Sequence, residues 1–177
     1  MRPRQLLLFD EPSWKGGLVH GGELARGKRK GTRPLSTKKP IHLVIRSHSA
    51  KGPMSLLLHS RFIRELIRSL CKRFAIVLYE FSVNSTHIHL LIRIPDREGL
   101  ISFLRIFCGK TAMHITGARR GKPLKEKFWD VLPFSRVAEW GQAFEIVRKY
   151  VFQNQLESLG LLSYRPRSHR KHLPLKQ

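Results

Sequence analysis

Acidic residues are scarce in this sequence. Its 177 residues include 12 Asp and Glu against 34 Lys and Arg, which gives a formal net charge of +22. A fold does not need such an excess, and the charges would repel one another without an anionic partner. Hydrophobic residues make up 41% of the chain, which is enough for a core and too many for a wholly disordered protein. The composition indicates one folded domain that binds nucleic acid.

Long apolar runs and cysteines are also lacking. The longest apolar runs are short, such as Leu6–Phe9, whereas a membrane-spanning helix needs roughly 20 apolar residues. The same stretch is too short for a secretory signal. The two cysteines, Cys71 and Cys108, lie too far apart for a zinc ribbon or a disulfide framework. We therefore expect a soluble, cytoplasmic, nucleoid-associated protein with no membrane partner.

The chain divides into three parts by composition. Residues 1–40 hold 10 basic and 3 acidic residues, many glycines and no core-forming pattern, which is typical of a flexible basic arm. Residues 161–177 are basic as well and predict a C-terminal tail. Hydrophobic periodicity is almost confined to residues 41–160, where we expect the folded domain.

Strands and helices alternate in this middle part. Period-two alternation predicts strands, and apolar residues at helical spacing predict helices. In order, we expect a strand at Ile41–Ser47, a helix at Ser60–Arg73, a hairpin of Phe74–Val83 and Thr86–Ile94, a long helix after Pro95, a strand region at Phe128–Val137 and a helix at Trp140–Leu159. The first six elements fit an α+β, ferredoxin-like (split βαβ) antiparallel sheet with helices on one face. The last helix is an addition to that arrangement.

Two of these elements also predict which residues face the core. In the first strand, Ile41, Leu43 and Ile45 share one face, and His42, Val44 and Arg46 share the other. The long helix begins with Asp96 or Ser102 as its N-cap. Its expected inner stripe consists of Leu100, Ile101, Leu104, Phe107, Cys108 and Ala112.

The third expected strand carries two histidines, His87 and His89, separated by one residue. Strand geometry places both imidazoles on one face, about 6–7 Å apart along the chain. Two neighbouring imidazoles can hold one divalent metal ion. A bare His-x-His is more often a strand with two exposed polar residues, so the pair alone is a weak signal.

The last helix carries Tyr150 and, four residues later, Asn154. Residues four apart lie on one face of a helix, so a phenol and an amide would face the same point. Gln153 is a second amide close by. The alternative is an ordinary amphipathic helix in which Tyr150 packs with its apolar neighbours.

Together these two features resemble a known family. The segment Phe81-Ser82-Val83-Asn84-Ser85-Thr86-His87-Ile88-His89-Leu90-Leu91-Ile92 is similar to the histidine–hydrophobe–histidine (HUH) strand of single-tyrosine transposases. The segment Tyr150-Val151-Phe152-Gln153-Asn154 resembles their catalytic helix, and its Tyr-Val-x-x-Asn form is closest to the REP-associated tyrosine transposases. There are two departures: Gln155 stands where proline usually follows the asparagine, and Asn84-Ser85-Thr86 replaces a Pro-Asn turn.

The resemblance implies a metal-dependent enzyme that cleaves and rejoins single-stranded DNA at hairpin, REP-like repeats. His87, His89 and Asn154 would bind Mg²⁺ or Mn²⁺, with Gln153 as a fallback ligand. Tyr150 would attack the phosphorus and form a 5′-phosphotyrosine. Two other tyrosines are rival nucleophiles: Tyr79, which falls mid-strand, and Tyr164, which falls in the tail.

Basic residues cluster in the loop after the long helix. They are Arg119, Arg120, Lys122, Lys125 and Lys127. Such a loop could contact DNA phosphates with salt-sensitive affinity, or it could be a solvated run of charge. The ranges Arg26–Arg33 and Arg165–Lys171 could hold flanking DNA in the same way.

A short apolar peptide in the arm, Gln5–Phe9, resembles the peptides that dock on the bacterial replication sliding clamp. The alternative is an anchor that packs on its own domain. The sequence leaves open whether the protein is a monomer or a homodimer.

Two other functions remain open from the sequence. One is a non-catalytic nucleic-acid-binding protein with the same fold, and the other is a metal-dependent RNA nuclease that uses histidines as acid and base. A tyrosine-linked DNA product separates the transposase from both.

Overall fold

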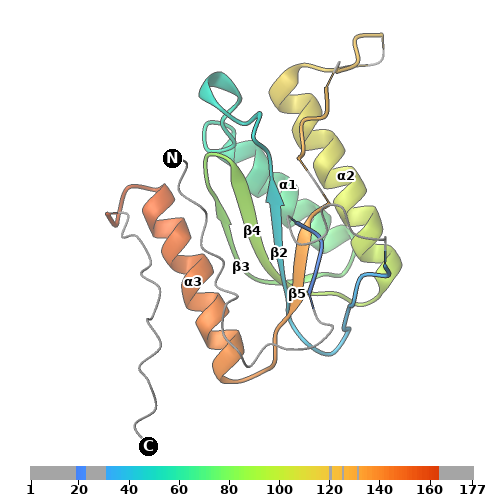
Figure 1. Ribbon diagram of the computed structural model, residues 1–177, viewed down its shortest axis with the longest axis vertical. Helices are drawn as coiled ribbons and strands as arrows, with labels where there is room; N and C mark the ends of the chain where they lie inside the picture. Colours follow the sequence, from blue (N-terminus) through green and yellow to red (C-terminus); the bar gives the residue numbers. More distant parts are fainter. Residues whose placement is uncertain (1–18, 23–30, 120, 125, 131, 164–177) are drawn as a thin grey trace, which may run out of the picture.

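The computed structural model describes residues 19–22, 31–119, 121–124, 126–130 and 132–163. They form one antiparallel sheet with strand order β1-β5-β2-β4-β3 (Figure 1). The strands are β1 (Val19–His20), β2 (Ile41–Arg46), β3 (Val77–Val83), β4 (His87–Arg93) and β5 (Phe134–Val137). The helices are a short 3-10 turn η3 (Gly52–Met54), α1 (Ser60–Arg73), α2 (Arg97–Thr116) and α3 (Gln142–Ser158).

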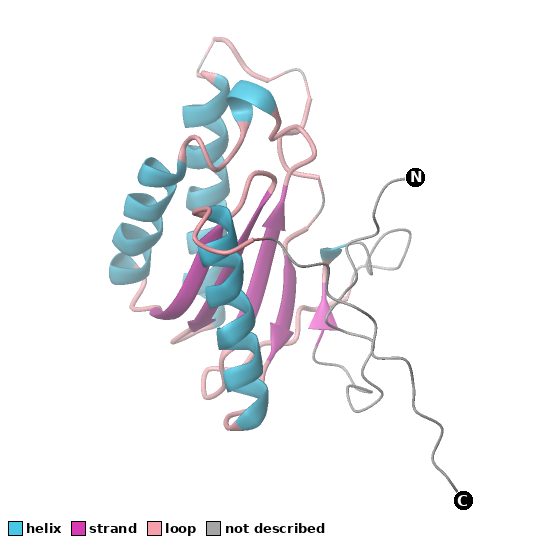
Figure 2. Ribbon diagram, turned by 90° about the vertical axis from the view of Figure 1, so that its left-hand side faces the viewer, coloured by secondary structure: helices cyan, strands magenta, loops and turns pink. Residues whose placement is uncertain are grey.

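Strands β5-β2-β4-β3 have the order of a split βαβ fold, as the sequence predicts. Helices α1 and α2 cover one face of the sheet, and α3 lies on the other (Figure 2). The predicted α+β, ferredoxin-like arrangement with an added C-terminal helix is therefore confirmed. Across the described residues, no helix combines the length and the apolar character needed to cross a lipid bilayer.

The main core lies between the sheet and the pair α1–α2. The β2 residues Ile41, Leu43 and Ile45 are almost completely buried in it, as period-two alternation requires. Helix α1 has the predicted bounds and buries Ile63, Leu66, Ile67, Leu70 and Cys71. The opposite residues of β2 face α3, which makes that side of the sheet the place to look for a site.

The inner stripe of α2 differs from the prediction. Ile101 is 48% exposed, whereas Phe103 and Thr111 are completely buried together with Leu100 and Phe107. One residue turns a helix by about 100°, so a phase error of one position moves a side chain off the buried face. Leu104, Cys108 and Ala112 are partly buried and border the core. Of the two predicted caps, Asp96 is correct, because its Oδ1 accepts a hydrogen bond from the Gly99 amide at 2.6 Å.

Strand β3 is shorter than predicted and contains a bulge. It begins at Val77 instead of Phe74, and its pairing with β4 shifts between Leu78 and Glu80. The extra residue lets Leu78 and Phe81, three positions apart, both pack against the main core. It also lets Tyr79 turn to the α3 side of the sheet.

The edge of the sheet at β5 holds a strand that the sequence did not predict. The predicted strand region Phe128–Val137 is a strand only from Phe134, and β1 pairs along it. Gly21 follows β1 with φ +82°, and a Cβ there would clash with the Pro133 carbonyl oxygen. A two-residue strand has no periodicity to read, so residues 1–40 showed only their basic, glycine-rich composition.

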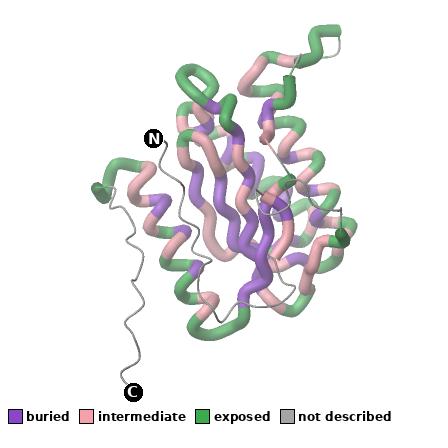
Figure 3. Tube along the Cα trace, in the orientation of Figure 1, coloured by how far each residue is buried: buried purple, intermediate pink, exposed green. Residues whose placement is uncertain are grey.

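A second, smaller core holds α3 on the sheet. Leu91 of β4 and Val147 and Val151 of α3 are buried together, and Tyr79, Phe144 and Tyr150 pack against them. Figure 3 shows α3 buried on the side toward the strands and exposed on its outer side. This cluster, rather than the main core, sets the position of Tyr150.

Candidate active site

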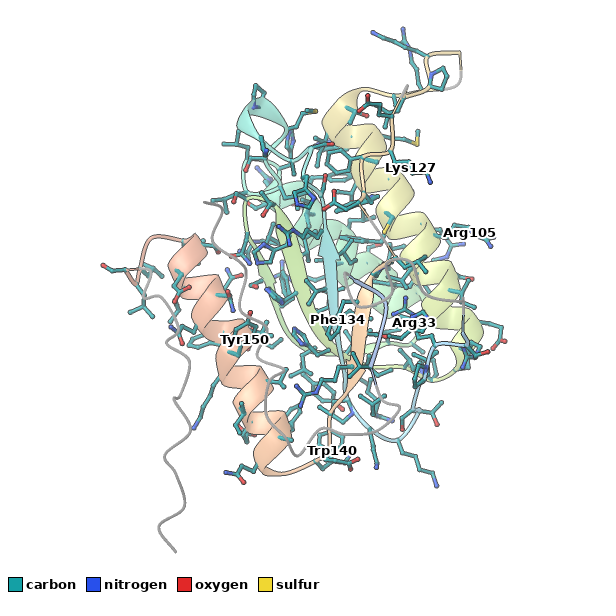
Figure 4. The ribbon with its side chains drawn as sticks, in the orientation of Figure 1. Arg33, Arg105, Lys127, Phe134, Trp140 and Tyr150 are labelled. Carbon is teal, nitrogen blue, oxygen red and sulfur yellow. The ribbon has the colours of Figure 1, made fainter. Side chains whose placement is uncertain are left out.

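Side chains from β2, β4 and α3 meet on the α3 face of the sheet. The rings of His87 and His89 are 4.8 Å apart between centroids, and the Tyr150 ring stands edge-on to His89 at 5.3 Å. Figure 4 shows Tyr150 on α3, beside the sheet. The structure therefore brings together the phenol and the two imidazoles that the sequence singled out.

Alternation along β4 explains how the two histidines share a face. Ile88, Leu90 and Ile92 are buried in the main core, so His87 and His89 point the other way. His89 is only 2% exposed and lies opposite Val44 of β2 and Ser82 of β3. The pair is therefore not the exposed polar strand that a bare His-x-His most often forms.

The phase of α3 decides between the two amides. Asn154 lies on the buried face with Val147 and Val151 and is 7% exposed. Its Nδ2 donates a hydrogen bond to the Tyr150 carbonyl oxygen at 2.7 Å, so Oδ1 is the atom that it could offer to a cation. Gln153 instead donates to Glu157 Oε1 at 2.7 Å.

The departure at position 155 has a structural consequence. Gln155 is nearly buried, and α3 continues past it to Ser158. A proline there would clash with the preceding turn and end the helix earlier. Because Asn154 precedes the substitution and keeps its place on the helix, the difference affects the helix end and leaves the amide in position.

Of the rival nucleophiles, Tyr79 contacts a different set of groups. Its ring packs edge-on against Trp140 and Phe144, at 5.7 and 5.2 Å between centroids. Its hydroxyl accepts a hydrogen bond from Arg93 Nε at 3.3 Å. Tyr164 and the peptide Gln5–Phe9 lie outside the described residues.

The donor atoms fit a divalent cation with water completing its shell. Across the described residues, no three His, Cys, Asp or Glu side chains are grouped to hold a metal, so a site at the two histidines would need another kind of donor, such as the Asn154 amide oxygen. The His87 nitrogens lie 3.2 Å from Asn84 Nδ2 and 3.3 Å from Thr86 Oγ1. A cation bound by His87 would replace one of these contacts. Without a carboxylate, the donor set is neutral and suits a cation that also binds a phosphate oxygen.

A third histidine, His42 of β2, belongs to the same cluster. Its Nε2 lies 3.1 Å from His89 Nδ1, and its ring is 6.1 Å from that of Tyr150. Burial, and secondarily the positive charge of Arg136, lower the pKa of His42 to about 3, so the ring is neutral near pH 7. Alternation placed His42 on the correct face of β2. Its contact with His89 depends on the pairing register of β2 and β4, which the sequence does not show.

The predicted DNA-binding loop lies at the end of α2, away from this cluster. Arg119, Lys122 and Lys127 are exposed, and Arg119 and Lys122 exchange two backbone hydrogen bonds that close a tight turn. Arg120 and Lys125 lie outside the described residues. Figure 4 shows Lys127 near α2, with the sheet between it and Tyr150.

Comparison with known proteins identifies the family. A family model described as IS200-like transposase matches residues 37–154, from just before β2 to Asn154. The chain belongs to this family. The match covers β2, both histidines of β4 and the tyrosine and asparagine of α3, so transposase activity is assigned to the domain that contains the cluster.

Solved structures extend the comparison for this IS200-like transposase. It is similar to a REP-associated tyrosine transposase bound to a REP hairpin, with 16% identity over 73% of each chain and a TM-score of 0.54. It is also similar to a candidate transposase from Deinococcus radiodurans, with 14% identity over 72% of this chain and 98% of that one, and a TM-score of 0.39. At 16% identity, the likeness to the first of these structures supports the fold. No curated protein matches the chain.

Proposed function

We propose that this IS200-like transposase cleaves and rejoins single-stranded DNA at hairpin, REP-like repeats through a 5′-phosphotyrosine. The observation that carries the proposal is the approach of Tyr150 to the histidine pair, with its ring 5.3 Å from that of His89. Asn154 lies one turn further along the same buried face of α3. This arrangement supports a site in which the phenol acts beside a metal ion held by the two imidazoles and the amide.

Tyr150 supplies the nucleophile. Its Oη bonds to the phosphorus while the bond from phosphorus to the 3′-oxygen breaks. The phenol loses one proton and the departing 3′-oxygen gains one, which gives a free 3′-hydroxyl. Attack by a different 3′-hydroxyl reverses these steps and rejoins the strand without ATP. His87, His89 and Asn154 would hold Mg²⁺ or Mn²⁺, and the bound ion would polarise the scissile phosphate.

The proposed substrate rests on charge and on one similar protein. The chain carries a net charge of +22, and the REP-associated tyrosine transposase of similar fold was solved with a REP hairpin. We extend hairpin binding to this chain on those grounds. We also propose that Gln5–Phe9 docks on a sliding clamp and that the protein associates with the nucleoid as a monomer or a homodimer. The folded domain is proposed to span residues 41–160, between a basic arm and a basic tail.

The basic loop is expected to contribute to affinity without setting the chemistry. Replacing Arg119 and Lys122 by alanine should make the negative slope of log affinity against log salt shallower by about 1.4, because each phosphate contact to a single strand contributes about −0.7. Fluorescence anisotropy with a labelled hairpin strand measures this slope. The double variant Arg61→Ala, Lys72→Ala removes the same charge from the exposed side of α1 and serves as control. Equal slopes for both variants would identify the loop as a solvated run of charge.

A denaturing gel tests the proposed function directly. We expect the wild-type protein, incubated with a labelled single-stranded hairpin and Mn²⁺, to give a protein-linked band that a chelator abolishes. A blunt duplex and an RNA of the same sequence serve as controls. Cutting of RNA without a protein-linked band would favour the RNA nuclease, and tight binding without cutting would favour the non-catalytic protein.

A further inference from the structure

We infer that His42 is a positioning residue: its Nε2 accepts a hydrogen bond from His89 Nδ1–H and thereby holds the lone pair of His89 on Nε2, for a cation. The inference rests on the proposed function, because it assigns His89 the role of metal ligand. The inference adds His42, a residue of β2, to a site built from β4 and α3.

The contact between the two histidines is close and buried. Their facing nitrogens are 3.1 Å apart, and the rings are nearly parallel, with an interplanar angle of 13° and 5.3 Å between centroids. His42 is 1% exposed and His89 is 2% exposed. Water therefore does not compete for this hydrogen bond, and its direction is set by the protein.

A neutral imidazole has one N–H donor and one acceptor nitrogen. If His89 donates from Nδ1, its Nε2 carries the lone pair and can ligate a metal ion. If the bond runs the other way, Nε2 of His89 carries the proton and can only donate. Hydrogen bonding at one ring nitrogen thus decides what the other can do, which is how outer partners orient metal-binding histidines.

Strand register explains why His42 is the partner. Val44 lies directly opposite His89 but has no polar group, and His42 is the next residue on the same face of β2. On its other side, His42 lies opposite Arg136 of β5. If the Arg136 guanidinium donated to His42 Nδ1, His42 would carry its proton on Nε2 and donate to His89 instead. The tautomer of His89 therefore distinguishes the two directions of this hydrogen bond.

The experiment is a long-range ¹H–¹⁵N NMR spectrum of the full-length protein without metal or DNA, in which the ring ¹⁵N shifts report the tautomer. We expect His89 to be protonated on Nδ1 in the wild type. In His42→Leu this preference should be lost, and in His42→Gln, whose side-chain oxygen can accept, it should be restored. A merely structural role for His42 would not move the tautomer of its neighbour.

Metal affinity gives a second readout. All proteins in this titration carry Tyr150→Phe, so that the hairpin strand bound to them stays uncleaved. Their affinity for Mn²⁺ should be 10–100-fold weaker with His42→Leu, and within a few-fold of the protein that keeps His42 with His42→Gln. A wild-type His89 protonated on Nε2 overturns the inference, as does equal loss in both variants. If His42→Leu does not fold, the wild-type tautomer alone decides. If His89 is protonated on Nδ1 but no protein-linked DNA forms, the proposed function is rejected, while the effect of His42 on the His89 tautomer is kept.

Discussion

Replacing Tyr150 by phenylalanine is expected to abolish the protein-linked DNA band, with a loss on the order of a thousandfold or more in strand cleavage. The substitution removes one oxygen atom and keeps the ring that packs edge-on against His89 and His42. Binding of the hairpin strand should therefore stay within a few-fold of wild type. Single-turnover cleavage on denaturing gels and anisotropy measure the two quantities separately.

Tyr79→Phe is the matched control for this experiment. Tyr79 also lies on the α3 side of the sheet, but its ring contacts Trp140 and Phe144 and its hydroxyl binds Arg93. It should form the covalent product at close to the wild-type rate. A Tyr150→Phe protein that still forms the product would assign the nucleophile elsewhere, and one that cuts without a covalent product would point to histidine chemistry.

Val151→Asp is expected to release α3 from the sheet and to eliminate cleavage while the main core stays folded. Val151 is completely buried against Leu91 and Val147, in a cluster separate from the core under α1 and α2. Burying an unpaired carboxylate there costs several kcal/mol, so the docked state should lose at least about 100-fold in population. Amide hydrogen exchange should show protection lost in α3 and retained in α1 and α2.

Phe152→Asp, one residue further along, provides the comparison. Phe152 is 50% exposed on the outer side of α3, so the same new charge remains in water. It should keep both exchange protection and cleavage near wild-type levels. Global loss of protection in Val151→Asp would show that the two clusters unfold as one unit.

The sequence predicted the elements that have a strong period of their own. Helix α1 has the predicted bounds because its apolar residues recur at helical spacing, and β2 shows the predicted faces because its alternation is regular. Helix α2 has apolar residues on several sides, so its stripe was wrong at Ile101. The bulge in β3 depends on its partner strand and left no mark in the local pattern.

The site divides in the same way. Spacings of two residues on a strand and of four residues on a helix are local relations. They predicted that His87 and His89 share one face of a strand and that Tyr150 and Asn154 share one face of a helix. One member of each pair meets the other in the structure, because the Tyr150 ring lies 5.3 Å from that of His89. The contact of His42 with His89 spans 47 positions, and it exists only because β2 and β4 pair in one register.

The short strand β1 has a consequence for where the chain can be shortened. It covers the free edge of β5, and Gly22 lies against the ring of Phe134. A fragment starting at residue 37, where the family match begins, would uncover backbone donors and acceptors along β5 and an aromatic ring beside them. Such an uncovered edge favours pairing between molecules, so β1 also lowers the tendency of the domain to aggregate.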